Sequence, residues 1–312
     1  MTSDHQPEAI GRARDTPELR QALERACAER ELSSAGARLI HHHSNAIYLL
    51  PAEQAVARIG SASARRARLS HAATGWLAAH AGIAATAPLP GAPPVDVDPS
   101  TVVSFWVYYP QPASNDPPTS VHLAQVLRHL HAIEAVPFEL DPWQPLTSLS
   151  AALSDPAAAA NLTRSELDWL GGLVEEVRAQ VGSLHWPLGH GVIHGDAWAG
   201  NLLWHTAGGP DAVVLGDWDW ISLGPREVDL VPTWHAAARY GRGEQWAEAF
   251  ARVYGYDLTA WEGFRTLLTM RDLVQLSGPL RRARDGPRFE AALRQRLDGI
   301  RRGDMQATWR AL

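Results

Sequence analysis

The sequence has 312 residues, 46% of them hydrophobic, and a formal net charge of −6. This length allows a sizeable buried core and favours two domains, and no apolar run is long enough to span a membrane. The N-terminal residues contain no apolar signal-peptide core, so we expect a cytoplasmic protein without a membrane partner. The single cysteine, Cys27, excludes an intramolecular disulfide and a thiolate metal cluster.

The basic residues have an unusual composition and distribution. All 28 of them are Arg, because the chain contains no Lys. Residues 226–312 carry 15 Arg against 11 acidic residues, whereas residues 1–225 carry 13 Arg against 23 acidic residues. No basic stripe with interleaved aromatic residues is present, so we do not expect a nucleic-acid partner.

The first third of the chain reads as a mixture of strands and helices. A helix is predicted from a capping Thr and a first-turn Pro at residues 16–17 to about Glu29. A second helix is predicted over 62–81. Strands are predicted over 37–41, 46–50, 55–59 and 101–109, with a hairpin connection at 51–53.

Helical patterns dominate after the proline-rich segment 110–118. Helices are predicted over 120–135 and 163–183, the second beginning with the capping box Thr163-x-x-Glu166, and more helices follow residue 232. The fold class is therefore α+β. We expect a small antiparallel-sheet domain at residues 1–107, a hinge at about 104–112 and a larger, mainly helical domain at 108–312.

Two polar turns follow apolar strand patterns. Residues 192–204 place His194, Asp196 and Asn201 on one short turn between apolar flanks. Residues 213–220 contain a second apolar run that ends in acidic residues. Loops at strand ends hold polar side chains on a rigid scaffold, so these two turns are the candidate site of chemistry.

The residue types in the two turns suit metal-assisted phosphoryl transfer. This reaction needs a carboxylate near the acceptor hydroxyl and oxygen ligands for a Mg²⁺ ion on the phosphates. Asp196 suits the first role, and Asn201 and Asp217 suit the second. For Asp219, a second metal contact, a loop cap and a solvated carboxylate all remain open.

The spacing His-x-Asp-x-x-x-x-Asn, followed by an apolar strand ending in Asp, resembles the catalytic and metal-binding loops of protein-kinase-like folds. With His194-Gly195-Asp196, Asp217-Trp218-Asp219 and the sequel Gly224 to Leu230, the chain resembles the aminoglycoside phosphotransferase and choline kinase superfamily most strongly over 190–232. The resemblance implies a bilobal kinase-like fold and an ATP- or GTP-dependent kinase that needs Mg²⁺ and phosphorylates a small-molecule hydroxyl. It also implies particular residue roles: Asp196 as catalytic base, His194 as a brace in the catalytic loop, Asn201 and Asp217 as metal ligands, and Asp229 as a buried anchor.

The resemblance is less complete on the nucleotide side. Arg58 occupies the strand position where the family commonly has a phosphate-binding Lys, and an exposed strand Arg is the alternative. The following helix offers Ser70 and His71 where the family commonly has the acidic partner of that Lys. We therefore expect this ion pair to be absent.

Other nucleotide contacts are implied by position. Ser44 and Asn45 lie on the turn that would cover the phosphates. Ser104, Trp106 and Val107 lie at the segment that would hold the nucleotide base, by backbone hydrogen bonds and apolar contact. Packing in the core is an equal alternative for the aromatic side chain.

Acceptor contacts are expected from the helices after the second turn. The candidates, each with core packing or a helix surface as its alternative, are Trp234, His235, Arg239, Arg271 and Asp272. A polycationic aminoglycoside would be expected to meet clustered carboxylates, so the basic character of 226–312 weakens that assignment. Aminoglycoside-like, sugar and amino-alcohol acceptors remain open.

Two other functions compete with a small-molecule kinase. A catalytically weak nucleotide-binding or regulatory module is suggested by the missing Lys and its missing acidic partner. A metal-dependent phosphohydrolase fits the carboxylates but not the Asp-x-x-x-x-Asn order. The sequence does not indicate an oligomeric state.

Overall fold

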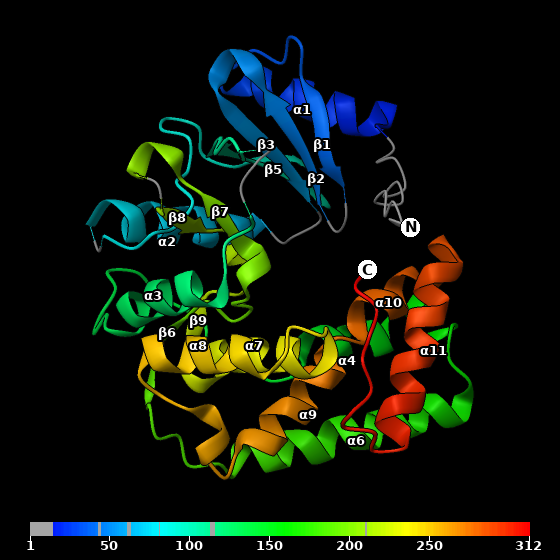
Figure 1. The fold of residues 1–312 in the computed structure, drawn as a ribbon. Helices are drawn as coiled ribbons and strands as arrows, with labels where there is room; N and C mark the ends of the chain where they lie inside the picture. The colour runs from blue at the N-terminus through cyan, green and yellow to red at the C-terminus, as the bar shows by residue number, and fades with distance from the viewer. Residues whose placement is uncertain (1–14, 43–44, 61–63, 81, 113–115, 210) are drawn as a thin grey trace, which may run out of the picture. The chain divides into compact units, whose positions relative to one another are not determined.

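The computed structural model describes residues 15–42, 45–60, 64–80, 82–112, 116–209 and 211–312. The chain forms two compact units, and Figure 1 traces their elements along the chain. Unit 1 comprises Met1–Ala113 with Trp204–Asp219, and unit 2 comprises Ser114–Leu203 with Trp220–Leu312. This division differs from the predicted one in two respects: unit 1 extends to Ala113 and not to residue 107, and the segment 204–219, expected in the second domain, belongs to unit 1.

Unit 1 contains a five-stranded antiparallel sheet in the order β1-β2-β3-β5-β4. Its strands are β1 (Arg38–His42), β2 (Ala46–Leu50), β3 (Ala55–Gly60), β4 (Val95–Asp98) and β5 (Thr101–Val107). Four of them match predicted strands, although β5 ends two residues earlier than predicted. The edge strand β4 was not predicted, because four residues with two Asp carry a weak strand signal.

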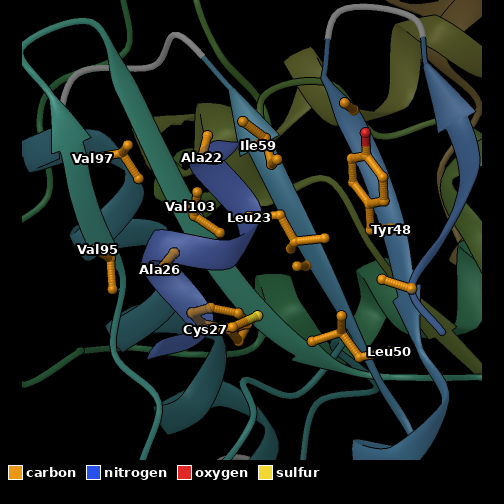
Figure 2. Packing of buried hydrophobic residues seen from close by; sticks show 14 of the residues in the cluster. Ala22, Leu23, Ala26, Cys27, Tyr48, Leu50, Ile59, Val95, Val97 and Val103 are labelled. Carbon is orange, nitrogen blue, oxygen red and sulfur yellow. The ribbon is translucent and has the colours of Figure 1, made fainter. Parts of the chain in front are cut away.

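Helix α1 (Pro17–Glu29) matches the predicted helix and packs against one face of this sheet. Thr16 caps it by accepting a hydrogen bond from the backbone of Leu19. Figure 2 shows Leu23 and Cys27 of α1 among buried side chains of the sheet. This contact removes apolar surface from both elements and makes the sheet a rigid support for β3, which carries Arg58.

The segment 204–219 joins unit 1 through backbone hydrogen bonds. Leu215 of β8 (Val213–Leu215) donates to the Ala84 carbonyl at 2.6 Å and accepts from Thr86 N at 2.9 Å. Short strand β7 (Leu202–Trp204) precedes this segment. These partners are far apart in the sequence, so no local pattern could predict where the segment belongs.

Unit 2 is mainly helical. Its helices of eight or more residues are α3 (Ser120–His131), α4 (Thr147–Ser154), α6 (Arg164–Gly182), α7 (Glu227–Arg239), α8 (Glu244–Tyr254), α9 (Phe264–Val274) and α11 (Pro287–Arg301). The predicted capping box starts α6, whereas α3 ends four residues before its predicted end. No helix in the described ranges is long and apolar enough to cross a bilayer.

One antiparallel strand pair in unit 2 supports the first polar turn. Strand β6 (His190–Ile193) pairs with β9 (Ser222–Pro225). Val192 and Ile193 at the end of β6 are buried, so the chain enters the turn from a fixed position. The first polar turn therefore begins at a packed strand end, as the apolar flank predicted.

Candidate active site

The loop after β6 turns sharply at Gly195. Its φ is +84°, a conformation that side chains with a Cβ rarely adopt. A Cβ added here would lie 2.4 Å from the carbonyl oxygen of Trp220, which is too close for a nonbonded contact of a Cβ atom. Glycine is therefore required between His194 and Asp196 for both conformational and steric reasons.

A buried carboxylate holds this loop in place. Asp229, in the first turn of α7, is fully buried, and its two oxygens accept hydrogen bonds from the amides of His194 and Gly195, each at 2.7 Å. His131 Nε2 lies 3.1 Å from the same carboxylate. Hydrogen bonds to a charged acceptor are stronger than neutral ones. Asp229 therefore has the anchoring contacts that the family resemblance implied.

Asp196 and Asn201 lie close together in the same loop. Asn201 Nδ2 donates to the Asp196 carbonyl at 3.1 Å, and its Oδ1 accepts from Trp198 Nε1 at 2.8 Å. The Asp196 side chain is 32% exposed, and Arg271 Nη2 lies 2.7 Å from its Oδ1. The buried His194 accepts a long hydrogen bond from the Asp196 amide through Nδ1, which suits the predicted brace. The loop thus presents one partly exposed carboxylate from a restrained backbone.

The second polar turn lies in unit 1 and contacts Arg58. Arg58 donates to both oxygens of Asp219, with Nη1 2.6 Å from Oδ1, and its Nη2 lies 3.2 Å from Asp217 Oδ1. Asp217 follows β8 and has a φ of +62°. This is a strained backbone conformation of the kind found at functional sites. The main contact of Asp219 is therefore an ion pair, which the sequence interpretation did not include.

Arg58 is a largely buried cation and not an exposed strand residue. Its side chain is 17% exposed. Burial alone would lower the pKa of the guanidinium, but the hydrogen bonds and charge of Asp219 raise this pKa above its ordinary value. With the amide oriented to satisfy its hydrogen bonds, the oxygen of Asn45 lies 2.6 Å from Arg58 Nη2.

A small cavity of about 20 Å³ lies beside this ion pair. It is lined by Asn45, Arg58, Gly60, Ala67, Ser70, Val102, Ser104, Trp106 and Asp219. Ser70 comes from α2 (Ala64–His80), and within the described part of the chain its Oγ has no hydrogen-bond partner. The carboxylate beside Arg58 thus comes from Asp219, while the helix contributes the Ser that the sequence predicted.

The predicted base-binding segment is engaged within unit 1. Ser104 Oγ accepts from Trp106 Nε1 at 2.9 Å, and both residues are buried. The Val107 amide donates to the Ala87 carbonyl at 2.9 Å. A nucleotide contact at these residues stays a prediction and would have to use groups other than this amide. Ser44, predicted on the phosphate-covering turn, lies outside the described residues.

Three predicted acceptor contacts lie inside unit 2. Trp234, His235 and Asp272 are 7%, 2% and 3% exposed. Asp272 accepts from Arg239 Nε at 2.9 Å and lies 3.0 Å from His235 Nε2. Burial lowers the pKa of His235 to about 4, despite the opposing effect of its hydrogen bond to the Asp272 carboxylate. These contacts are those of a structural cluster, and acceptor binding by the three residues stays a prediction.

Comparisons with known proteins identify the family of the chain. The model of the family described as "Phosphotransferase enzyme family" matches residues 36–267, which is most of the chain. The chain belongs to the phosphotransferase enzyme family. The family consists of enzymes that transfer phosphoryl groups to hydroxyl groups, so the chain is a phosphotransferase with an alcohol group as acceptor. No curated protein sequence matches the chain significantly.

Solved structures show the same kinase-like α+β fold. An amicoumacin kinase in complex with AMP-PNP, Ca²⁺ and Ami has a TM-score of 0.68 at 12% identity, covering 92% of this chain and 94% of the other. A choline kinase from Streptococcus pneumoniae has a TM-score of 0.63 at 11% identity, covering 91% and 99%. A choline/ethanolamine kinase family protein from Mesorhizobium loti has a TM-score of 0.59 at 18% identity, covering 90% and 94%. These TM-scores establish the fold, and identities this low leave the acceptor open.

The oxygen donors of the two turns fit a magnesium ion by their chemistry. Asn201 offers an amide oxygen from unit 2, and Asp217 offers a carboxylate that is 49% exposed from unit 1. Mg²⁺ prefers oxygen ligands and is commonly held by one or two carboxylates together with substrate phosphates. No group of three or more His, Cys, Asp or Glu that could hold a metal occurs among the described residues. Metal binding by Asn201 and Asp217 therefore stays a prediction.

The buried His235 should make stability depend on pH. Its pKa is about 4 in the folded chain against an ordinary 6.5, so the unfolded chain binds an additional proton between these values. The free energy of unfolding should therefore fall as the pH falls from 6.5 to 4, by up to about 1.4 kcal/mol per pH unit from this residue. Urea denaturation at several pH values should show that the free energy of unfolding depends less steeply on pH in His235→Gln. The exposed control His129→Gln should keep the wild-type dependence on pH. Equal slopes in all three proteins would contradict this assignment.

Replacing the loop anchor should destabilise unit 2. Asp229→Asn places an NH₂ group opposite an amide donor, because only one of the two oxygens remains. We expect the free energy of unfolding to fall by about 1–3 kcal/mol in urea denaturation. Asp168→Asn changes an exposed carboxylate on α6 and should stay within about 0.5 kcal/mol of wild type. Similar losses in the two variants would show that Asp229 does not anchor the loop.

Proposed function

We propose that this protein is a Mg²⁺-dependent small-molecule kinase, which transfers the γ-phosphoryl group of ATP or GTP to a hydroxyl of an aminoglycoside-like, sugar or amino-alcohol acceptor. The observation that carries this proposal is the anchored loop, which holds Asp196 partly exposed beside Asn201. The family match and the nucleotide in the amicoumacin kinase complex support it.

The proposed reaction assigns one chemical step to Asp196. The acceptor hydroxyl oxygen forms a bond to the γ-phosphorus as the bond to the β,γ-bridging oxygen breaks, and the electron pair leaves with the nucleoside diphosphate. The hydroxyl proton passes to the Asp196 carboxylate. A bound Mg²⁺ would neutralise charge on the phosphates, with Asn201 and Asp217 as its protein ligands.

Arg58 is the proposed phosphate-binding residue in this chain without Lys. A guanidinium can contact phosphate oxygens with two N–H groups. A carboxylate that accepts two hydrogen bonds from the same guanidinium fixes the orientation of its plane. Asp219 supplies that partner within unit 1. We therefore assign to the Arg58–Asp219 pair the role that a Lys and a helix acid have in related enzymes.

A nucleotide-binding module with weak catalysis is the second candidate. The observation in its favour is that Arg58 and Asp196 each already form an ion pair, with Asp219 and Arg271 respectively. This candidate predicts nucleotide binding without transfer to any acceptor. The first experiment below distinguishes the two candidates.

Loss of the proposed base should abolish most turnover. A coupled ADP-release screen over aminoglycosides, other hydroxylated antibiotics, amino sugars, choline-like alcohols and homoserine should identify an acceptor for the wild type. With that acceptor, Asp196→Asn should lower kcat by about 10²–10⁴-fold, because it cannot accept the proton. Exposed Asp211→Asn is the control and should match wild type. Nucleotide binding by calorimetry, together with no release of ADP from ATP or of GDP from GTP over the whole panel, would favour the second candidate.

Loss of the proposed metal ligands should change the Mg²⁺ requirement. Asp217→Asn and Asn201→Ala should each raise the Mg²⁺ concentration needed for half-maximal ADP release by at least about tenfold. Calorimetric titration of nucleotide with and without Mg²⁺ provides a second readout that does not need turnover. The control Asp211→Asn should reproduce the wild-type titration. Unchanged Mg²⁺ curves in the two ligand variants would exclude these residues as ligands.

A further inference from the structure

Asp196 has an ion-pair partner that neither the family match nor the loop sequence assigns. Arg271 lies on α9, and its side chain is only 10% exposed. Its Nη2 lies 2.7 Å from Asp196 Oδ1. The contact joins the proposed base to a helix that follows the catalytic loop at a long distance in the sequence.

The two oxygens of Asp196 have different environments. Oδ1 is buried and faces Arg271, whereas the side chain as a whole keeps 32% of its exposure. The exposed part of the carboxylate is therefore on the side of Oδ2. A carboxylate held through its inner oxygen presents its outer oxygen in a defined direction, which is what proton transfer from an acceptor requires.

Arg271 is itself held in unit 2. It is buried on α9, which packs against α6 and α7. The neighbouring Asp272 pairs with Arg239 and His235, and within the described part of the chain the ion pair of Arg271 is with Asp196. Asp272 therefore does not draw the guanidinium away from the catalytic loop.

The contact depends on charge more than on direction. The distance is that of a close ion pair, but neither Asp196 Oδ1 nor Arg271 Nε has a hydrogen-bond partner in the described part of the chain. An ammonium group at the same place could therefore replace the guanidinium. This property separates a positioning role from recognition of an acceptor by the two-pronged guanidinium.

We propose that Arg271 is a positioning residue, which holds Oδ1 of Asp196 and leaves Oδ2 to accept the proton of the acceptor hydroxyl. This inference rests on the proposed function, since it needs Asp196 to be the base. The Asp229 hydrogen bonds and the Asn201 contact fix the backbone of the loop. Arg271 fixes the side chain, which these backbone contacts do not reach.

The test compares Arg271→Gln, Arg271→Lys and Arg265→Gln in steady-state assays with the acceptor found in the screen. Arg265 is an exposed residue on the same helix and serves as the matched control. Arg271→Gln should lower kcat by about 10–100-fold, the loss expected for a misplaced catalytic group, with both KM values within about threefold of wild type. Arg271→Lys should recover most of kcat, and Arg265→Gln should match wild type.

Two kinetic outcomes would overturn the inference. Wild-type kcat in Arg271→Gln would show that Asp196 does not need this contact. A large rise in the acceptor KM with kcat retained, not rescued by Arg271→Lys, would show that Arg271 binds the acceptor instead.

A double-mutant cycle, measured by thermal denaturation, tests the ion pair without turnover. The Tm losses of Arg271→Gln and Asp196→Asn should differ from additivity in the double variant by about 2 °C or more, since contacting residues couple. Additive losses would overturn the inference even in a fully active enzyme. If no acceptor supports turnover, the proposed function fails, and the cycle still decides whether Arg271 holds Asp196.

Discussion

The candidate active site of unit 2 depends on the buried carboxylate of Asp229. A loop that leaves a packed strand has backbone amides that need partners, and a buried charge needs hydrogen bonds. The hydrogen bonds from His194 and Gly195 to Asp229 satisfy both needs at once. Because α7 carries Asp229, the position of the catalytic loop is coupled to the helical packing of unit 2. This coupling explains how a short polar turn can hold Asp196 in a restrained position.

The absence of Lys changes how cations are used in this phosphotransferase. Arg keeps its charge in buried positions and forms planar, paired contacts with carboxylates. In the described residues this occurs at Arg58 with Asp219 and at Arg239 with Asp272, whereas Arg271 forms a single close ion contact with Asp196. Each proposed reactive or phosphate-binding group thus has a fixed partner. The charges of these pairs are therefore balanced in the absence of substrate. A nucleotide that contacts Arg58, or an acceptor that contacts Asp196, would have to replace or add to the existing ion contacts.

The carboxylates proposed to face the acceptor differ from what a polycation would be expected to need. The buried carboxylate of Asp272 is neutralised by Arg239, and that of Asp196 is paired with Arg271. Neither carboxylate therefore adds a full uncompensated negative charge to attract a polycation. This agrees with the basic character of residues 226–312 in the sequence. The acceptor screen accordingly needs neutral alcohols and singly charged amino alcohols as well as aminoglycosides.

The sequence by itself determined the features that depend on local pattern. The capped helix α1, the strands β1 to β3, the capping box of α6 and the loop with Asp196 and Asn201 all follow from periodicity, turn residues and motif spacing. The α+β class follows from the order of these elements, and the resemblance of the two turns to a known family implied the kinase-like fold. Only the tertiary structure decided which distant residues meet: Asp219 with Arg58, Arg271 with Asp196, and residues 83–86 with β8. The physical reason is that an ion pair or a bridge between distant segments depends on the packing of whole elements, which leaves no periodic signal in the residues that form it.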